Sequence, residues 1–173
     1  MKGLRLKHIE DKLMDHVSAA RKIEIWRLKN NKIVFTNGCF DILHKGHVSY
    51  LAEAASLGNK LVVALNTDAS VKRQGKGDDR PVNNEDARSI VISALGFVDM
   101  VVFFDKDIPL DLIEKLRPDI LVKGADYDPE ETDKTSKSYI VGSDIVIANG
   151  GEVKAIPLVE GYSTTSIINK LRD

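Results

Sequence analysis

The sequence is poor in cysteine and has almost no excess of charge of either sign. Cys39 is the only cysteine among 173 residues, so the chain cannot form an internal disulfide, a composition typical of a reducing compartment. A net charge of −1 gives no electrostatic basis for binding nucleic acid or an anionic membrane. No apolar run is long enough to span a bilayer, and the first residues lack the apolar stretch of a signal peptide. We therefore expect a cytoplasmic protein with neither a nucleic-acid nor a membrane partner.

The sequence does contain a regular alternation of short apolar segments and longer periodic ones. Continuous apolar runs such as Leu61–Leu65 are typical of strands buried on both faces of a parallel sheet. Predicted strands cover residues 33–35, 61–65, 100–103, 120–122 and 153–156, and predicted helices cover 46–57, 85–95, 110–116, 138–149 and 163–172. The alternation predicts an α/β fold, with a Rossmann-like, doubly wound parallel sheet of five strands and helices on both faces.

The first thirty residues precede this alternation. Residues 9–30 carry an apolar stripe, which predicts a single helix. We therefore divide the chain into an N-terminal helical extension, residues 1–30, and the α/β domain, residues 31–173. The extension either packs on the edge of the domain, which we favour, or is a dimerisation helix or a linker from a fused domain. We expect the protein to form a homo-oligomer, a dimer.

The stretch KIVFTNGCFDILHKGH, residues 32–47, joins the first predicted strand to a helix. α/β proteins bind phosphates at such junctions, because the first N–H groups of the helix are unpaired and carry partial positive charge. Gly46 leaves room for a phosphate near the backbone, and His44 and His47 can project to one side. The alternative is a surface histidine pair at a helix cap. A zinc site is disfavoured, because the two histidines are three residues apart and no cysteine or further histidine stands next to them.

Polar residues also follow the other predicted strands, at the edge of the sheet where ligands bind in such folds. They occur at residues 66–68, at residues 123–126 and in the Ser-Thr-Thr run at residues 163–165. The loop over residues 66–84 is basic and can close over phosphates. Each feature has a simpler alternative: a turn at Asp126, an N-cap at Ser163 and a solvated charge run in the loop.

The segment TNGCFDILHKGH resembles the signature of the HxGH nucleotidyltransferase superfamily, whose members attack the α-phosphate of a nucleoside triphosphate and release pyrophosphate. The segments VVALNTDASVKR, RPVNNEDARSIVISAL, DILVKGADY and NGGEVKAIPLVEGYSTTSII resemble the bacterial D-glycero-β-D-manno-heptose 1-phosphate adenylyltransferases. Those enzymes exist alone or as half of a bifunctional heptose kinase and adenylyltransferase. The resemblance spans residues 32–172 and implies transfer of AMP from ATP to the heptose 1-phosphate. The products would be ADP-heptose, for lipopolysaccharide core or a related surface glycan, and pyrophosphate.

The pattern and the resemblance together assign roles to individual residues of this nucleotidyltransferase domain. The catalytic candidates are His44, His47 and Lys72. The nucleotide-binding candidates are Thr36, Asn37, Gly38, Cys39, Phe40, Gly46, Arg88, Lys123, Gly124, Asp126, Ser163, Thr164 and Thr165. The candidates for binding the sugar 1-phosphate are Asp41, Asn66, Asp68, Lys76 and Arg80. For Arg88 the alternative is a surface ion pair, and for Asp41 it is ordering of the loop. No protein metal site is expected, because Mg²⁺ would arrive with ATP.

One departure bears on the choice of nucleotide. The glycerol-phosphate cytidylyltransferases carry an arginine shortly before their Ser-Thr-Thr segment, whereas this sequence has Leu-Val-Glu-Gly at residues 158–161. The absence of that arginine favours ATP over CTP as the nucleotide. Two alternatives stay open: a cytidylyltransferase acting on a polyol or glycerol phosphate, and a nucleotide-binding module without turnover, against which the intact histidine pair argues.

Overall fold

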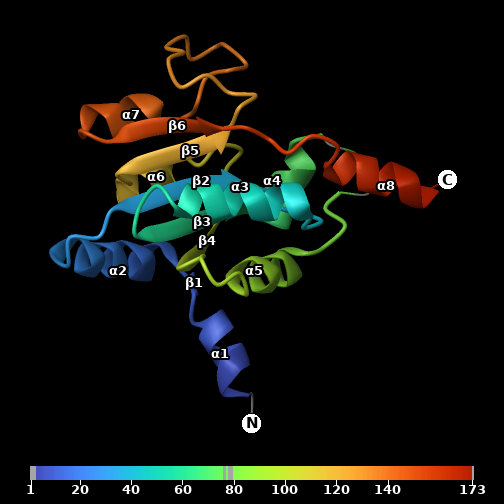
Figure 1. Ribbon diagram of the computed structural model, residues 1–173, viewed down its shortest axis with the longest axis horizontal. Helices are drawn as coiled ribbons and strands as arrows, with labels where there is room; N and C mark the ends of the chain where they lie inside the picture. The colour runs from blue at the N-terminus through green and yellow to red at the C-terminus, as the bar shows by residue number, and fades with distance from the viewer. Residues whose placement is uncertain (1–2, 76, 78–79, 173) are drawn as a thin grey trace.

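The computed structural model describes residues 3–75, 77 and 80–172, and it contains a six-stranded parallel sheet (Figure 1). The strands are β1 (Leu13–Met14), β2 (Ile33–Gly38), β3 (Lys60–Asn66), β4 (Met100–Phe104), β5 (Ile120–Gly124) and β6 (Glu152–Ile156). Their order across the sheet is β1-β4-β3-β2-β5-β6, and all of these pairings are parallel. The predicted α/β, Rossmann-like class is confirmed, and the predicted strand count of five is corrected to six.

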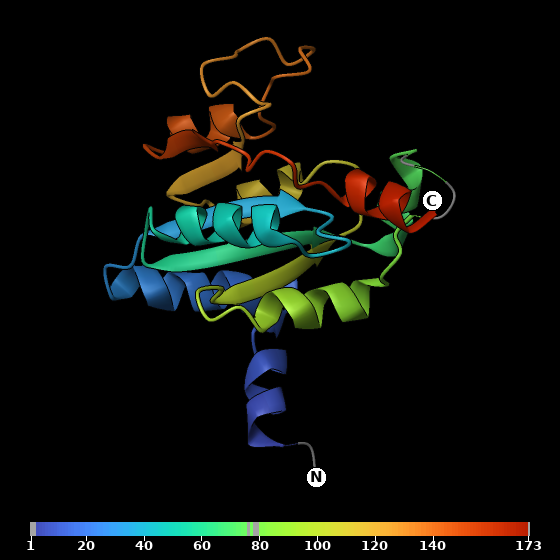
Figure 2. The same ribbon diagram turned by 45° about the vertical axis from the view of Figure 1, so that its right-hand side comes forward.

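Helices cover both faces of the sheet, as the two ribbon views show (Figures 1 and 2). The helices are α1 (Leu4–Glu10), α2 (His16–Leu28), α3 (Lys45–Ala55), α4 (Asp68–Arg73), α5 (Glu85–Ser93), α6 (Leu110–Leu116), α7 (Ser143–Ala148) and α8 (Thr164–Arg172). Side chains of α2, α6 and α7 pack on one face, and those of α3 and α5 pack on the other. None of these helices, as far as the chain is described, has the length and apolar character needed to cross a bilayer.

The additional strand, β1, lies within the segment where a single helix over residues 9–30 was predicted, so that prediction is wrong. Helix α1 ends in a turn, β1 pairs with β4 at the edge of the sheet, and α2 then begins. Asp15 caps α2, because its Oδ1 accepts the N–H groups of Val17 at 2.8 Å and Ser18 at 2.9 Å. A strand of two residues leaves no periodicity of its own in the sequence.

Two apolar clusters, one on each face, hold the helices to the sheet. Successive strand residues point to opposite faces, so Phe35 and Ala64 belong to one cluster and Val34 and Val63 to the other. These four side chains are fully buried. Trp26 of α2 belongs to the first cluster, so this helix contributes to the same core as the sheet. The domain boundary drawn at the end of the N-terminal extension stays a prediction.

The order of the strands reverses at β2. From β2 the chain adds β3 and β4 on one side, and then returns to place β5 and β6 on the other. The register between β2 and β5 joins residues 34–36 to residues 120–122, and β2 continues to Gly38 beyond that pairing. A reversal of this kind leaves a crevice outside the carboxyl ends of the strands, where doubly wound proteins bind ligands.

Candidate active site

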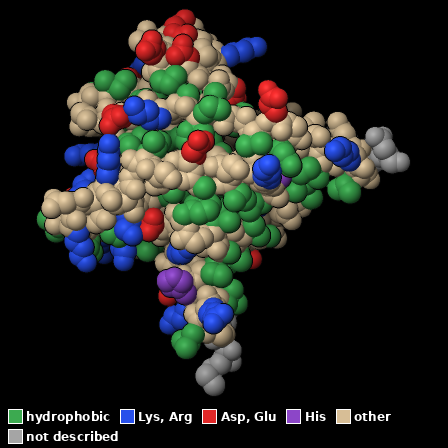
Figure 3. Space-filling view, in the orientation of Figure 1, with side chains coloured by type: hydrophobic (Ala, Val, Ile, Leu, Met, Phe, Trp, Pro, Cys, Tyr) green, Lys and Arg blue, Asp and Glu red, His purple; other side chains and the backbone are tan. Residues whose placement is uncertain are grey.

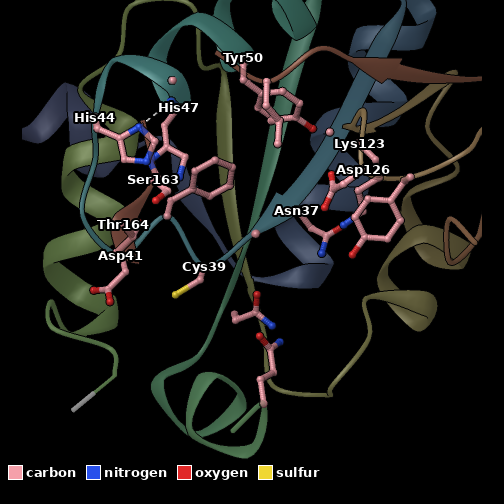
Figure 4. A pocket seen from close by; sticks show the side chains of 18 of the residues that line it. Asn37, Cys39, Asp41, His44, His47, Tyr50, Lys123, Asp126, Ser163 and Thr164 are labelled. Atoms are coloured by element: carbon pink, nitrogen blue, oxygen red, sulfur yellow. Dashed lines mark hydrogen bonds between the residues drawn. The ribbon is translucent and has the colours of Figure 1, made fainter. Parts of the chain in front are cut away.

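A cavity of about 700 Å³ lies at this crevice. The ends of β2 and β5, the start of α3 and the segment leading into α8 line it (Figure 4). The structure brings most of the predicted site residues together in its wall: Asn37, Gly38, Cys39, Phe40, Asp41, His44, Gly46, His47, Asn66, Arg80, Lys123, Gly124, Asp126, Ser163 and Thr164. These residues are spread over the whole chain, so their convergence follows from the parallel topology.

Other predicted site residues lie outside the cavity wall. Thr36 is fully buried, and its hydroxyl lies 2.7 Å from the hydroxyl of Tyr50. Lys72 is exposed on α4 and Thr165 is exposed on α8. Lys76 lies outside the described residues. The roles proposed for these residues from the sequence stay predictions.

His44 and His47 are stacked at the start of α3 (Figure 4). Their ring centroids are 3.7 Å apart and their planes differ by 19°. His44 is the N-cap of the helix, and its Nδ1 accepts the backbone N–H of His47 at 3.4 Å. Because Nδ1 is the acceptor, the neutral His44 ring carries its proton on Nε2. That Nε2 is buried without a hydrogen-bond partner among the described residues, so it is an available donor.

The pair is uncharged near neutral pH. Burial, together with the adjacent His44, lowers the pKa of His47 to about 4, while a hydrogen bond with the backbone of Ile42 acts in the opposite direction. Burial also lowers the pKa of His44. An anion placed against these rings would favour their protonated forms and raise both pKa values. The two rings at this helix N-terminus are therefore suited to an oxyanion.

The depressed pKa of His47 predicts a loss of stability in mild acid. The unfolded imidazole binds a proton near pH 6.5 and the folded one only near pH 4, so the unfolded state holds more protons in that interval. The free energy of unfolding should therefore fall as the pH drops from 6.5 towards 4, by about 2–3 kcal/mol for this histidine. Denaturant titrations across this interval measure the change, and His47→Asn should reduce it.

His8 is the matched control, because it is exposed on α1, in the N-terminal segment that projects from the rest of the molecule (Figure 3). His8→Asn should keep the wild-type dependence of stability on pH. Identical pH dependence in the wild type and in His47→Asn would contradict the assignment.

Arg88, predicted to bind the nucleotide or to form a surface ion pair, is 1% exposed, so it does not form a surface ion pair, and its role in nucleotide binding stays a prediction. Its guanidinium donates to the carbonyl oxygens of Cys39 and Asn66, both at 2.8 Å, and to Asp68 Oδ1 at 2.7 Å. A further N–H donates to the carbonyl oxygen of Asn83 at 3.1 Å. Arg88 thus joins the ends of β2 and β3 beneath the cavity. Asp68 is occupied by this ion pair, and a substrate-binding role for it stays a prediction.

Several residues of the cavity wall escaped the sequence-based prediction. The Tyr50 hydroxyl donates to the carbonyl oxygen of Val122 at 3.2 Å and so bridges β2 and β5 at the floor. Tyr162 lies beside the histidines, with Lys45 Nζ 5.4 Å from its ring centroid. Tyr127 lies below Lys123, whose Nζ is 5.3 Å from the ring centroid. Tyr50 follows His47 by one helical turn, and that spacing was the available signal.

The two ends of the cavity differ in chemistry (Figure 4). The histidines, Ser163 and Thr164 gather at one end, and Ser163 Oγ caps α8 by accepting the N–H of Ser166 at 3.0 Å. Asn37, Lys123 and Asp126 lie at the other end, where Asn37 Oδ1 is buried with no partner among the described residues. The first end suits phosphate groups, and the second suits hydroxyl or base edges. Within residues 3–75, 77 and 80–172, no cluster of His, Cys, Asp and Glu is arranged to hold a metal ion.

A family model described as cytidylyltransferase-like matches residues 35–170, which include the histidine pair, the cavity wall and most of α8. The chain belongs to the cytidylyltransferase-like family. It is therefore a nucleotidyltransferase, in agreement with the resemblance found in the sequence.

Curated relatives of this cytidylyltransferase-like chain carry the name Bifunctional protein HldE. The protein from Campylobacter concisus (strain 13826) is 59% identical over 142 residues, which are 82% of this chain and 27% of that protein. The protein from Marinomonas sp. (strain MWYL1) is 53% identical over 149 residues, which are 86% of this chain and 30% of that protein. The chain thus spans less than a third of the length of these two relatives.

Solved structures agree with the fold. The lipopolysaccharide core biosynthesis protein from Thermoplasma volcanium GSS1 matches with a TM-score of 0.57 and 28% identity, covering 77% of this chain and 99% of that one. Pantoate-beta-alanine ligase from Francisella tularensis, complexed with beta-gamma ATP and beta-alanine, also has a TM-score of 0.57, covering 93% of this chain and 79% of that one. Its 16% identity supports likeness of fold alone.

Proposed function

We propose that this nucleotidyltransferase transfers AMP from ATP to D-glycero-β-D-manno-heptose 1-phosphate, giving ADP-heptose and pyrophosphate. The observation that carries the chemistry is the stacked histidine pair at the N-terminus of α3, with the unpaired Nε2–H of His44 in the wall of the cavity. Similarity to proteins named HldE and to a lipopolysaccharide core biosynthesis protein supports the heptose substrate. The product would serve lipopolysaccharide core or a related surface glycan.

The proposed reaction needs positioning and charge stabilisation more than proton transfer. A phosphate oxygen of the heptose 1-phosphate attacks the α-phosphorus of ATP, and the bond from that phosphorus to the bridging oxygen of pyrophosphate breaks. The attacking oxygen is already anionic at neutral pH, so no general base is required. His44 Nε2–H donates to an α-phosphate oxygen as the phosphorus becomes five-coordinate, where a preorganised donor is most effective.

The β- and γ-phosphates would bind at one end of the cavity, and the substrate hydroxyl groups would bind at the other. Ser163 and Thr164, at the start of α8, offer hydroxyl and backbone N–H donors to the β- and γ-phosphates. Mg²⁺ would enter as part of the substrate, bound to the triphosphate, and share its charge. Asn37 and Asp126 offer acceptors to sugar or ribose hydroxyl groups at the opposite end.

Pyrophosphate release measured with defined substrate pairs tests the proposal. Turnover with ATP and D-glycero-β-D-manno-heptose 1-phosphate, with ADP-heptose as the product, is the expected result. Turnover with CTP and glycerol 3-phosphate alone would identify the cytidylyltransferase alternative. Binding of ATP without pyrophosphate release from any pair would identify a module without turnover.

Gly46 should be important for activity, because a side chain at its position crowds His44 and Tyr162. A Cβ there would lie 3.1 Å from the His44 ring and 3.3 Å from Tyr162 Cβ, so both neighbours would have to move. We expect Gly46→Ala to lower kcat/KM by about tenfold or more, because a small displacement of a positioning group costs that much. The better helix propensity of alanine should offset the crowding, so the free energy of unfolding should change by less than about 1 kcal/mol.

Gly96→Ala is the matched control, since a Cβ at residue 96 meets no atom within 4 Å. This variant should keep wild-type kcat/KM in the pyrophosphate-release assay. Wild-type activity in Gly46→Ala would contradict this prediction and show that the His44–His47 pair can be displaced without loss of activity.

A further inference from the structure

Arg80 reaches the cavity from the segment between α4 and α5, and Asp41 fixes its direction. Arg80 Nε donates to Asp41 Oδ2 at 2.6 Å, and both residues line the cavity. The Arg80 side chain is 11% exposed and that of Asp41 is fully buried. The ion pair with Asp41 is formed through Nε of Arg80. The two Nη groups have no partner among the described residues, so their N–H groups can donate to another acceptor.

Asp41 also fixes the backbone that carries Arg80. Its carboxylate accepts the N–H of Val82 at 3.0 Å and the N–H of Asn83 at 2.9 Å. The Asn83 side-chain amide donates in return to the Asp41 carbonyl oxygen at 2.8 Å. Three N–H donors thus share this carboxylate, and Arg80 contributes only its Nε–H, so the delocalised positive charge of the guanidinium is still presented at the two Nη groups.

Arg88, which is buried in the core, also binds the segment that carries Arg80. Its Nε–H donates to the carbonyl oxygen of Asn83, and its Nη1–H donates to that of Cys39. Cys39 lies three residues after Thr36 of β2 and two residues before Asp41, in the loop that leads to the histidines. The segment that carries Arg80 is therefore fixed relative to the loop that carries the histidine pair.

We propose that Arg80 binds a phosphate group of the substrates and that Asp41 is its positioning residue. A guanidinium in a fixed orientation, whose Nη groups have no partner among the described residues, matches the oxygens of a phosphate. The phosphate comes either from the pyrophosphate portion of the nucleotide or from the sugar phosphate. The identity of these substrates rests on the proposed function, whereas binding of a phosphate group at Arg80 does not depend on turnover.

Calorimetric titration of the whole chain with inorganic pyrophosphate tests the binding step without catalysis. Arg80→Ala should weaken pyrophosphate binding by about 10- to 100-fold, the usual effect of losing a hydrogen-bonded charged donor. Arg80→Lys should recover part of this loss, because lysine keeps the charge but lacks the fork. Arg21→Ala, which removes an exposed charge from α2, should bind pyrophosphate as the wild type does. Equal affinities in Arg80→Ala and Arg21→Ala would overturn the assignment of Arg80.

The role of Asp41 has its own readouts. Asp41→Asn should weaken pyrophosphate binding by about tenfold while AMP binding is kept, and Asp41→Asn combined with Arg80→Ala should be no weaker than Arg80→Ala alone. Loss of AMP and pyrophosphate binding together, or additive losses in the double variant, would show a purely structural role and overturn the positioning assignment.

Steady-state kinetics identify the source of the phosphate. A rise in KM for ATP alone in Arg80→Ala assigns Arg80 to the nucleotide, and a rise in KM for heptose 1-phosphate alone assigns it to the acceptor. Unchanged KM values for both would overturn the proposal. If no substrate pair turns over but pyrophosphate affinity still depends on Arg80, the proposed function fails and the phosphate site stands.

Discussion

Replacing His47 with alanine should lower kcat by about 10²- to 10³-fold, the usual effect of removing one preorganised transition-state donor. The structure gives two reasons for a large effect. The His47 ring stacks on His44 at a centroid distance of 3.7 Å, so its removal leaves His44 without the surface that orients it. The buried, unpaired Nδ1 of His47 is also lost from the site.

The substitution of His47 should lower kcat in the pyrophosphate-release assay without changing the fold. His47 is at the third residue of α3, where alanine is a good helix former, so circular dichroism should be unchanged. His8→Ala, on the exposed face of α1, should keep wild-type kcat. A higher KM with kcat unchanged would instead make His47 a residue of uniform substrate binding.

Replacing Arg88 with alanine should lower the free energy of unfolding by about 3–5 kcal/mol, the usual cost of breaking a buried charge pair. The substitution leaves the Asp68 carboxylate without its cationic partner and the carbonyl oxygens of Cys39, Asn66 and Asn83 without their donors. Urea denaturation at neutral pH measures the loss. Arg88→Lys should recover little of it, because a single ammonium cannot reach four acceptors in the plane of a guanidinium.

Arg21→Ala is the control for loss of charge, and its free energy of unfolding should stay within about 0.5 kcal/mol of the wild type. A different outcome would support the nucleotide-binding role predicted from the sequence. If Arg88→Ala keeps wild-type stability and raises only the KM for ATP, Arg88 contacts the nucleotide and its burial is incidental.

The histidine pair could be predicted from the sequence because its chemistry and its position are both local. His44 and His47 flank Gly46 at the end of an apolar strand, and each of these features is visible within sixteen residues. Helix α6 was likewise predicted at its exact bounds, Leu110–Leu116, because apolar spacing and a following proline define it. The family resemblance is confirmed by the match over residues 35–170, while the choice of ATP and of heptose 1-phosphate stays a proposal.

Features that depend on distant parts of the chain were not predictable. From the sequence, Arg88 was assigned to nucleotide binding or to a surface ion pair, and only the fold shows that backbone carbonyls from three other segments surround it. Helix α4 was assigned to a polar loop, because six residues that include Lys72 and Arg73 carry too little apolar periodicity. Helix α7 begins at Ser143, five residues later than predicted, because a left-handed Gly142 precedes it.

The two-residue strand β1 has a consequence for anyone who shortens this chain. Leu13 and Met14 cover the outer side of β4, whose backbone donors and acceptors would otherwise face water on that side. An uncovered parallel strand is a template on which a strand of another molecule can add. The residues ahead of α2 do not line the cavity. Their removal would nevertheless expose the edge of β4 and make the sheet prone to aggregation. The N-terminal segment therefore protects this edge of the sheet, and a shortened chain should keep Leu13 and Met14.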